Sequence, residues 1–128
     1  MSPAIDPHEW VFCRLDATYD VASLRPLLVF HEREATTVLI TRDTAESHEL
    51  PFAFPSRRIT ARVHSSLDAV GFLAAMTDAL ARYAIPVNVV SAFYHDHLFV
   101  PVDRAEEALR ILNGLSAAQA RRALALSN

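Results

Sequence analysis

The sequence predicts an α+β protein with a ferredoxin-like βαββαβ sandwich built from two halves. The first observation is the order of elements after residue 57, which reads strand, helix, strand, strand, helix. The second is the composition of the 128-residue chain: 52% of the residues are hydrophobic and 21% are charged, enough apolar surface for one compact body. The third is the proline-containing stretch Leu50–Ser56, where periodic patterns stop. It divides the chain into a first, abbreviated half (residues 1–55) and a second half with a C-terminal helix (residues 56–128).

In the first half, short runs of β-branched and aliphatic residues favour strands. Met1–Glu9 carries two prolines and mixed polarity, so we interpret it as an extended lead-in rather than a strand. The charged segment Glu32–Glu34 separates two such runs and predicts a hairpin. Asp43 is expected to cap a short helix that ends near His48. The predicted strands are Trp10–Leu15, Leu27–His31 and Thr36–Thr41.

The second half shows clearer periodicity. Ile59, Ala61 and Val63 alternate with polar residues, which indicates a strand with one buried face. From Val70 to Tyr83 apolar residues recur every three or four positions, which indicates a helix with one buried face, and Pro86 is expected to end it. The predicted strands are Arg58–His64, Val87–Phe93 and His97–Val102, and the predicted helices are Leu67–Tyr83, Asp103–Asn113 and Ser116–Leu126.

The second half lacks the last strand of a ferredoxin-like unit. An unpaired apolar sheet edge promotes association, so folds tend to cover it. We therefore expect a strand of the first half, such as Trp10–Leu15, to fill this edge. The two halves are predicted to interlock.

Composition excludes several classes of function. The net charge of −3 comes from 12 basic and 15 acidic residues without a basic cluster, which disfavours nucleic acid as a partner. The apolar runs are too short for a membrane helix and the N-terminus shows no export signal, so we expect a cytoplasmic protein with no membrane partner. The single cysteine, Cys13, lies in an apolar stretch and is expected to be a buried thiol. With only two glycines there is no phosphate-binding loop, and we expect no cofactor.

Three strings in the second half carry a resemblance to a known family: Leu67–Ala75, Ile85–Val90 and Tyr94–Pro101. They resemble the small tandem ACT-domain proteins of bacteria and, more distantly, the regulatory ACT domains of aspartokinases. In the first half, Trp10–Cys13 and Phe30–Ile40 match the same small proteins. The resemblance implies two ACT-like halves that form a regulatory module without catalytic activity. It also implies a homodimer that binds a small molecule of the amino-acid class at an interface between paired domains.

The resemblance also indicates where a ligand would bind. Gly71 matches the glycine that opens the first helix and lets the backbone approach the ligand, and Asn88 matches an acidic or amide position on the second strand. Free amides before Gly71 could accept a carboxylate at the helix start. Each residue also has a structural explanation: Gly71 could serve tight packing, Asp68 could cap a helix, and Asn88 could be solvated. The predicted ligand-binding residues are Ser66, Leu67, Asp68, Val70, Gly71, Phe72, Val87, Asn88, His95 and Asp96.

The string His95-Asp96-His97 admits a metal or acid-base interpretation. A zinc site needs three or four ligands, and the further ligands are not evident, although His64 and His48 could complete one. Alternatively, Asp96 holds a hairpin turn through a side-chain bond to the backbone, or His95 and Asp96 touch a ligand. We expect neither a metal nor a catalytic group here. Two alternatives to the regulatory function remain: a structural oligomerisation domain, and a metal-dependent enzyme that uses this segment.

Overall fold

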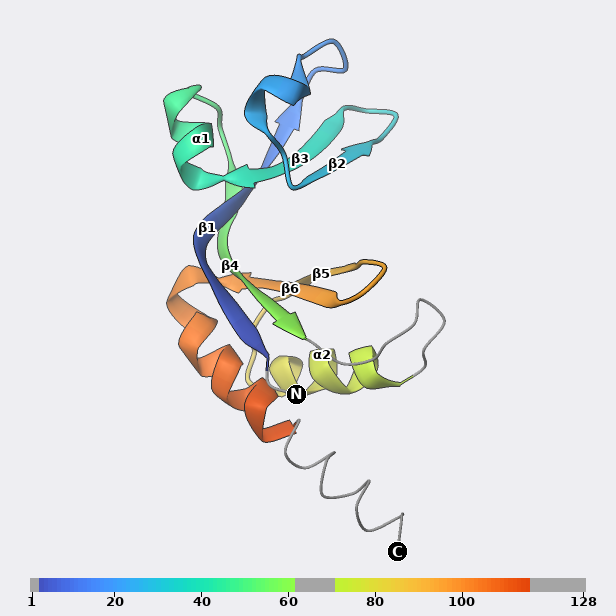
Figure 1. Cartoon of the computed structure of the whole chain (residues 1–128), viewed down its shortest axis with the longest axis vertical. Coiled ribbons are helices and arrows are strands. Elements are labelled where there is room, and N and C mark those ends of the chain that lie inside the picture. The colour runs from blue at the N-terminus through green and yellow to red at the C-terminus, as the bar shows by residue number, and fades with distance from the viewer. Residues whose placement is uncertain (1–2, 62–70, 116–128) are drawn as a thin grey trace, which may run out of the picture.

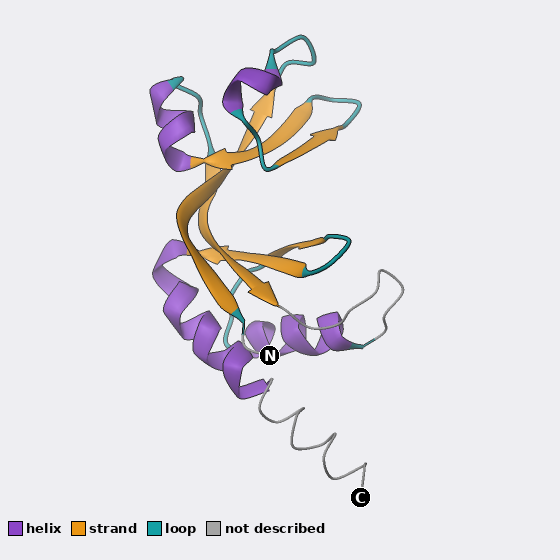
Figure 2. Ribbon diagram, in the orientation of Figure 1, coloured by secondary structure: helices purple, strands orange, loops and turns teal. Residues whose placement is uncertain are grey.

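The computed structural model describes residues 3–61 and 71–115, which form one antiparallel sheet with helices on its outer face. The six strands lie in the order β2-β3-β1-β4-β6-β5. They are β1 (Ala4–Leu15), β2 (Leu28–His31), β3 (Thr36–Thr41), β4 (Ala53–Ala61), β5 (Asn88–Ser91) and β6 (Asp96–Pro101). The helices are α1 (Arg42–Ser47), α2 (Phe72–Arg82), two 3₁₀ turns, η1 (Val21–Leu24) and η2 (Val102–Arg104), and helical residues 105–115. The α+β prediction is confirmed (Figure 1, Figure 2). Predictions for residues 62–70, and the helix predicted over 116–126, lie outside the described residues.

The two halves interlock by sharing β1 and β4 in the middle of the sheet. The first part of β1 pairs with the end of β4, with Ala4 opposite Thr60 and Ile5 opposite Ile59. The rest of β1 pairs with β3. Strands β1-β4-β6-β5 and β4-β1-β3-β2 therefore each have the strand order of a ferredoxin-like unit. The predicted interlocking is confirmed, and the segment of β1 that pairs with β4 begins at Ala4 and extends to Phe12, so it starts earlier than the predicted strand Trp10–Leu15.

The N-terminal lead-in is a strand, contrary to the prediction. Its prolines misled the interpretation, because proline interrupts a strand only where its missing amide is needed for pairing. Here Pro7 lies in a register shift between Ile5 and Glu9, where the ladder is already broken. The His8 amide donates to Asp6 Oδ1 at 2.8 Å, a local bond that stabilises this irregularity.

β4 also starts earlier than predicted. It runs unbroken from Ala53 through Pro55 to Ala61, although we expected the strand to begin at Arg58. The division of the chain near residue 55 thus falls inside a strand that pairs with both parts of β1. The division itself stays a prediction.

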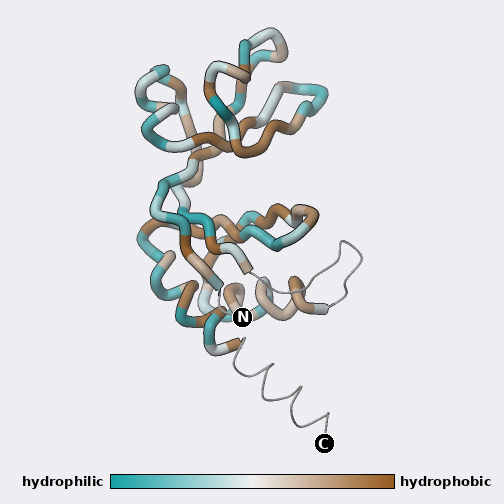
Figure 3. Tube along the Cα trace, viewed as in Figure 1, coloured by the Kyte–Doolittle hydropathy of each residue, from teal (hydrophilic) through white to brown (hydrophobic). Residues whose placement is uncertain are grey.

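The two hairpins repeat each other at a spacing of 60 residues, since β3 begins at residue 36 and β6 at residue 96. Both strands have the same burial pattern, with buried residues at the first, third, fourth and fifth positions. The turns match as well: the Glu32 amide donates to the Ala35 carbonyl at 3.0 Å, and Ala92 to His95 at 2.9 Å. The tips differ in polarity: the β2–β3 tip is hydrophilic, whereas the β5–β6 tip is mixed and includes hydrophobic residues (Figure 3).

Three further predictions, on the start of α1, the end of α2 and the burial of Tyr83, differ from the structure. Thr41, not Asp43, caps α1, because its hydroxyl accepts the Thr44 amide at 3.2 Å. α2 ends at Arg82, before Pro86, because Ala84 adopts a φ of 55° and the Ile85 amide bonds to the Leu80 carbonyl at 3.1 Å. Tyr83, expected on the buried face, is 57% exposed.

Side chains pack in three clusters on the two faces of the sheet. On the outer face of the second half, Met76 and Leu80 of α2 and Leu112 pack on the sheet. In the first half, α1 and η1 cover a smaller cluster that contains the buried Cys13, whose pKa is raised by burial, as expected of an inert thiol. The third cluster lies on the inner face, centred on Trp10, Leu39 and Phe99. None of the helices in the described ranges has the length and apolar content needed to cross a membrane.

Candidate functional site

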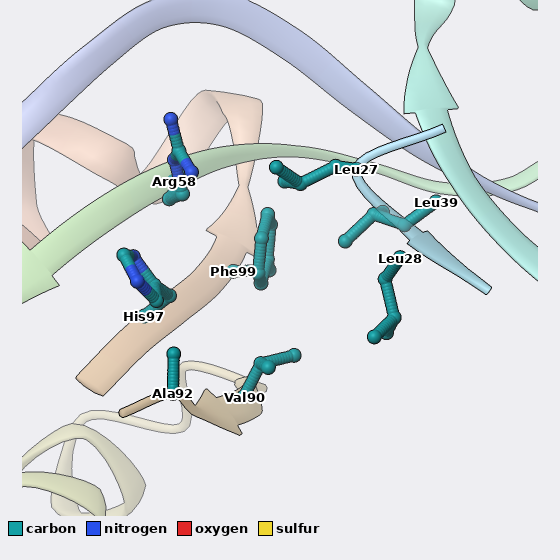
Figure 4. A pocket seen from close by; sticks show the side chains of 8 residues that line it. All are labelled: Leu27, Leu28, Leu39, Arg58, Val90, Ala92, His97 and Phe99. Carbon is teal, nitrogen blue, oxygen red and sulfur yellow. The ribbon is translucent and has the colours of Figure 1, made fainter. Parts of the chain in front are cut away.

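A cavity of about 130 Å³ lies on the inner face of the sheet, between the two hairpins (Figure 4). One wall comes from the first half and the other from the second. Its lining residues are Leu27, Leu28, Leu39, Arg58, Val90, Ala92, His97 and Phe99. All are apolar except Arg58 and His97. The volume lies below the roughly 300–1,000 Å³ of drug-binding pockets, so the cavity suits a ligand of few heavy atoms.

Strand register explains why these residues meet. Residues opposite each other on neighbouring strands share a face of the sheet. Leu28 lies opposite Leu39, and Arg58 lies opposite Phe99. The opposite face of these strands carries Val38, Ile40, Ile59, Leu98 and Val100, which pack in the clusters under the helices. The curl of the sheet then turns the two inner faces toward each other (Figure 1).

Arg58 is the cation that lines the cavity, and contacts with Asp6 and Trp10 fix its position. Its Nη2 donates to Asp6 Oδ2 at 2.7 Å, and its guanidinium carbon lies 5.5 Å from the centroid of the Trp10 ring. The side chain of Arg58 is only 24% exposed. Its Nε is buried and has no hydrogen-bond acceptor among the residues that the structure describes. A buried donor without an acceptor is costly, so this group is poised to bind an oxygen ligand.

Asp6 is the anchor for Arg58. Besides the guanidinium it accepts the His8 amide at 2.8 Å and the Trp10 Nε1–H at 3.3 Å. Partial burial acts to raise the pKa of Asp6, but these hydrogen bonds and the Arg58 charge outweigh it and hold that pKa below the usual 3.8. Asp6 is therefore ionised at neutral pH and fixes the position of Arg58.

His97 is the second polar group of the cavity. Its Nδ1 lies 3.0 Å from the Thr60 hydroxyl. Burial, the Arg58 charge and His95 lower the pKa of His97 below 6.5, and Asp96 opposes them in part. The imidazole is thus mostly neutral at pH 7. It can offer one N–H donor, whose position depends on the tautomer.

Metal binding gains no support from the geometry. The His95 and His97 ring centroids are 6.3 Å apart and the rings are nearly perpendicular. Across residues 3–61 and 71–115, no three His, Cys, Asp or Glu side chains come close enough to hold an ion. His64, considered as a completing ligand, lies outside the described residues.

Comparisons with known proteins agree with this architecture. One ACT-domain model matches residues 1–57 and a second ACT-domain model matches residues 55–114. A Vibrio cholerae protein of unknown function, described as a possible transport protein, has a solved structure that superposes with a TM-score of 0.83 at 38% identity. The match covers 88% of this chain and 86% of that one. The chain belongs to the ACT-domain family. ACT domains are in general regulatory modules that bind small molecules such as amino acids.

Two more distant ACT-fold structures show the same fold. A protein from Agrobacterium tumefaciens has a TM-score of 0.73 at 17% identity, over 87% of this chain and 85% of that one. The regulatory subunit of aspartate kinase from Thermus flavus has a TM-score of 0.63 at 12% identity, over 88% and 95% of the two chains. A comparison with curated proteins finds no match.

Six of the ten ligand-binding residues predicted from the ACT resemblance lie in the described part of the chain, and their joint role stays a prediction. Ser66, Leu67, Asp68 and Val70 lie outside the described residues. Phe72 and Val87 pack on the outer-face cluster, whereas Asn88 is exposed and lies opposite Phe99, on the inner face. At the start of β6, His95 is half-buried and Asp96 is 6% exposed. The turn spans residues 92–95, so Asp96 belongs to the strand and not to the turn as predicted.

Sequence reasoning missed Arg58, His97 and Asp6 as a group. Arg58 was visible as a polar residue on an alternating strand, which indicates only that it faces away from the outer core. His97 was considered as a metal ligand. No local pattern relates Asp6 to Arg58, 52 residues away.

Gly71 precedes α2 and is not inside the helix, contrary to the prediction. It adopts a φ of 94°, and a Cβ atom there would meet nothing within 4 Å in the described part of the chain. Backbone conformation explains this glycine better than tight packing does.

Gly71→Ala should therefore lower the free energy of unfolding by about 1–3 kcal/mol, the usual cost of a strained backbone conformation. Gly114, in helical residues 105–115, also has an unobstructed Cβ position but no positive φ. Gly114→Ala should stabilise the protein by up to about 1 kcal/mol. Urea unfolding followed by circular dichroism measures both changes. Equal effects of the two substitutions would contradict this explanation of Gly71.

Proposed function

We propose that this chain is a cytoplasmic, homodimeric regulatory ACT module that binds an amino acid and has no catalytic activity. The observation that carries the proposal is the pair of ACT-domain matches, which together span residues 1–114. The regulatory subunit of an aspartate kinase shares the fold, and the known role of such modules is ligand-dependent control.

The proposed amino-acid site is the predicted one, around Gly71 and Asn88. Asn88 is exposed on β5, an edge strand of the sheet. The amide carries both a donor and an acceptor, which suits the ammonium and carboxylate of an amino acid. An edge strand adds free backbone groups beside it, and a paired domain would complete the site.

Thermal unfolding against the twenty common amino acids and zinc tests the proposal. One amino acid should raise the midpoint of the wild-type protein, and at 100 times its dissociation constant it stabilises by about 2.7 kcal/mol. Asn88→Ala should abolish this shift. Asn113→Ala, which changes an exposed asparagine in the helix of residues 105–115, should keep it.

Each other outcome argues against the proposal in its own way. No shift with any amino acid would favour a structural oligomerisation domain. A shift with zinc alone would favour the enzyme that uses His95 and His97. An amino-acid shift that survives Asn88→Ala would keep the function but remove the site.

A further inference from the structure

We propose that the cavity between the two hairpins is a second ligand site, specific for a small monocarboxylate with an apolar body and no amino group. It is separate from the part of the predicted amino-acid site that the structure describes: the cavity lining includes none of Gly71, Phe72, Val87, Asn88, His95 and Asp96. The chemical class includes short branched fatty acids and the corresponding 2-oxo acids.

The walls of the cavity select an apolar body. Leu27, Leu28 and Leu39 form one side, and Val90, Ala92 and Phe99 the other (Figure 4). Aliphatic and aromatic walls favour hydrocarbon, because its transfer from water is favourable in proportion to the buried area. The volume of about 130 Å³ limits the ligand to a few heavy atoms.

The polar end of the cavity selects a carboxylate. Arg58 lines the cavity, and a guanidinium can bind a carboxylate with two parallel hydrogen bonds. Asp6 already uses Nη2, and Nε is buried and has no acceptor within residues 3–61 and 71–115. In the proposed complex the guanidinium turns so that Nε donates to a ligand oxygen while the bond to Asp6 is kept. A bound carboxylate would thus satisfy a donor that the described part of the free protein leaves unpaired.

His97 and the charge of Arg58 discriminate against an amino group. An ammonium ion in the cavity would meet the Arg58 cation and apolar side chains, a setting in which a buried charge is costly. The mostly neutral His97 can instead donate an N–H to a second oxygen of the ligand. The cavity therefore favours 3-methylbutanoate over leucine, although both share the same branched body.

Isothermal titration calorimetry of the full chain with four probes tests the site: 3-methylbutanoate, 3-methylbutan-1-ol, 3-methylbutan-1-amine and leucine. We expect 3-methylbutanoate to bind roughly 10- to 100-fold more tightly than the alcohol, the usual effect of a hydrogen bond to a charged group. The amine should not bind. Equal binding of the acid and the alcohol would overturn the role of Arg58.

Three variants locate the binding. Arg58→Met should weaken 3-methylbutanoate binding by roughly 10- to 100-fold, whereas Arg82→Met, at an arginine that is 75% exposed on α2, should not change it. Val90→Phe fills the cavity, leaves the Arg58–Asp6 pair intact, and should abolish binding even if Arg58→Met fails to fold. Retained affinity in Val90→Phe would exclude the cavity as the site.

Leucine binding to the variants distinguishes a failure of this inference from a failure of the proposed function. Leucine binding that is lost in Asn88→Ala but retained in Arg58→Met concerns the amino-acid site alone. Leucine binding that is as tight as that of 3-methylbutanoate, and that is lost in Arg58→Met, would show that the cavity takes amino acids and would overturn the ligand class proposed here.

Discussion

Phe99→Ala should lower the free energy of unfolding by about 3–5 kcal/mol, the usual cost of truncating a buried phenylalanine. The side chain is 1% exposed and packs with Trp10 and Leu39 where the two halves meet. Phe12 places its ring edge-on to Phe99, with centroids 6.3 Å apart. Phe99 belongs to the second half, whereas Trp10, Leu39 and Phe12 belong to the first. Truncation therefore removes packing between the two halves.

Urea unfolding measures this loss, and Phe93→Ala is the matched control. Phe93 lies on the tip of the β5–β6 hairpin and is 72% exposed, so its truncation should change stability by no more than about 0.5 kcal/mol. Similar losses of unfolding free energy from the two substitutions would show that Phe99 does not lie in a packed contact between the two halves.

Unfolding should also be a single transition. β1 and β4 each pair with strands of both halves, so neither half keeps a complete sheet when the other opens. The fluorescence of Trp10, the only tryptophan, reports on the contact between the two halves, and circular dichroism reports on the whole chain. The two signals should have the same midpoint in the wild type and in Phe99→Ala. Separate midpoints would contradict the shared sheet.

The sequence predicted those elements whose signals are local. Both hairpins were found because charged or turn-forming residues separate two runs of β-branched and aliphatic residues, as in Leu28–His31 and Thr36–Thr41. The lead-in was missed because Pro7 and the mixed polarity of residues 4–9 hide a strand that depends on pairing with β4. Such pairing is a long-range contact that no local pattern encodes. The continuity of β4 through Pro55 was hidden for the same reason.

The cavity could not be predicted because its residues come from five strands, β2 to β6, and from two loop positions. Alternation assigned Arg58 and His97 to one face of their strands but did not show which residues face them from the first half. That information lies in the register of β2 against β3 and in the curl of the sheet. The family resemblance pointed to Gly71 and Asn88, and α2 begins only at Phe72 because Gly71 has a positive φ. The resemblance gave no information on the inner face.

Asp6→Asn should cost about 2–3 kcal/mol at pH 7, somewhat less than the 3–5 kcal/mol for breaking a fully buried ion pair. The substitution keeps the shape of the side chain but leaves the Arg58 cation without its counter-ion, and the two side chains are only 11% and 24% exposed. Asp78→Asn is the matched control. Asp78 pairs with Arg82 at 2.9 Å on the surface of α2, where both side chains are more than half exposed, so its loss should change stability by no more than about 0.5 kcal/mol.

The pH dependence of the Asp6→Asn effect tests its electrostatic origin. The pKa of Asp6 is lower in the folded protein than the usual 3.8, so the unfolded chain binds more protons near that pH. The stabilisation by ionised Asp6 is complete above pH 3.8 and is lost as the pH falls through the folded pKa. The difference in unfolding free energy between wild type and Asp6→Asn should therefore be full at pH 7 and should shrink steadily below pH 3.8. A difference that is unchanged in the most acidic buffer in which both proteins stay folded would mean that Asp6 acts through shape and not through charge, and Arg58 would then need another explanation for its fixed position at the cavity.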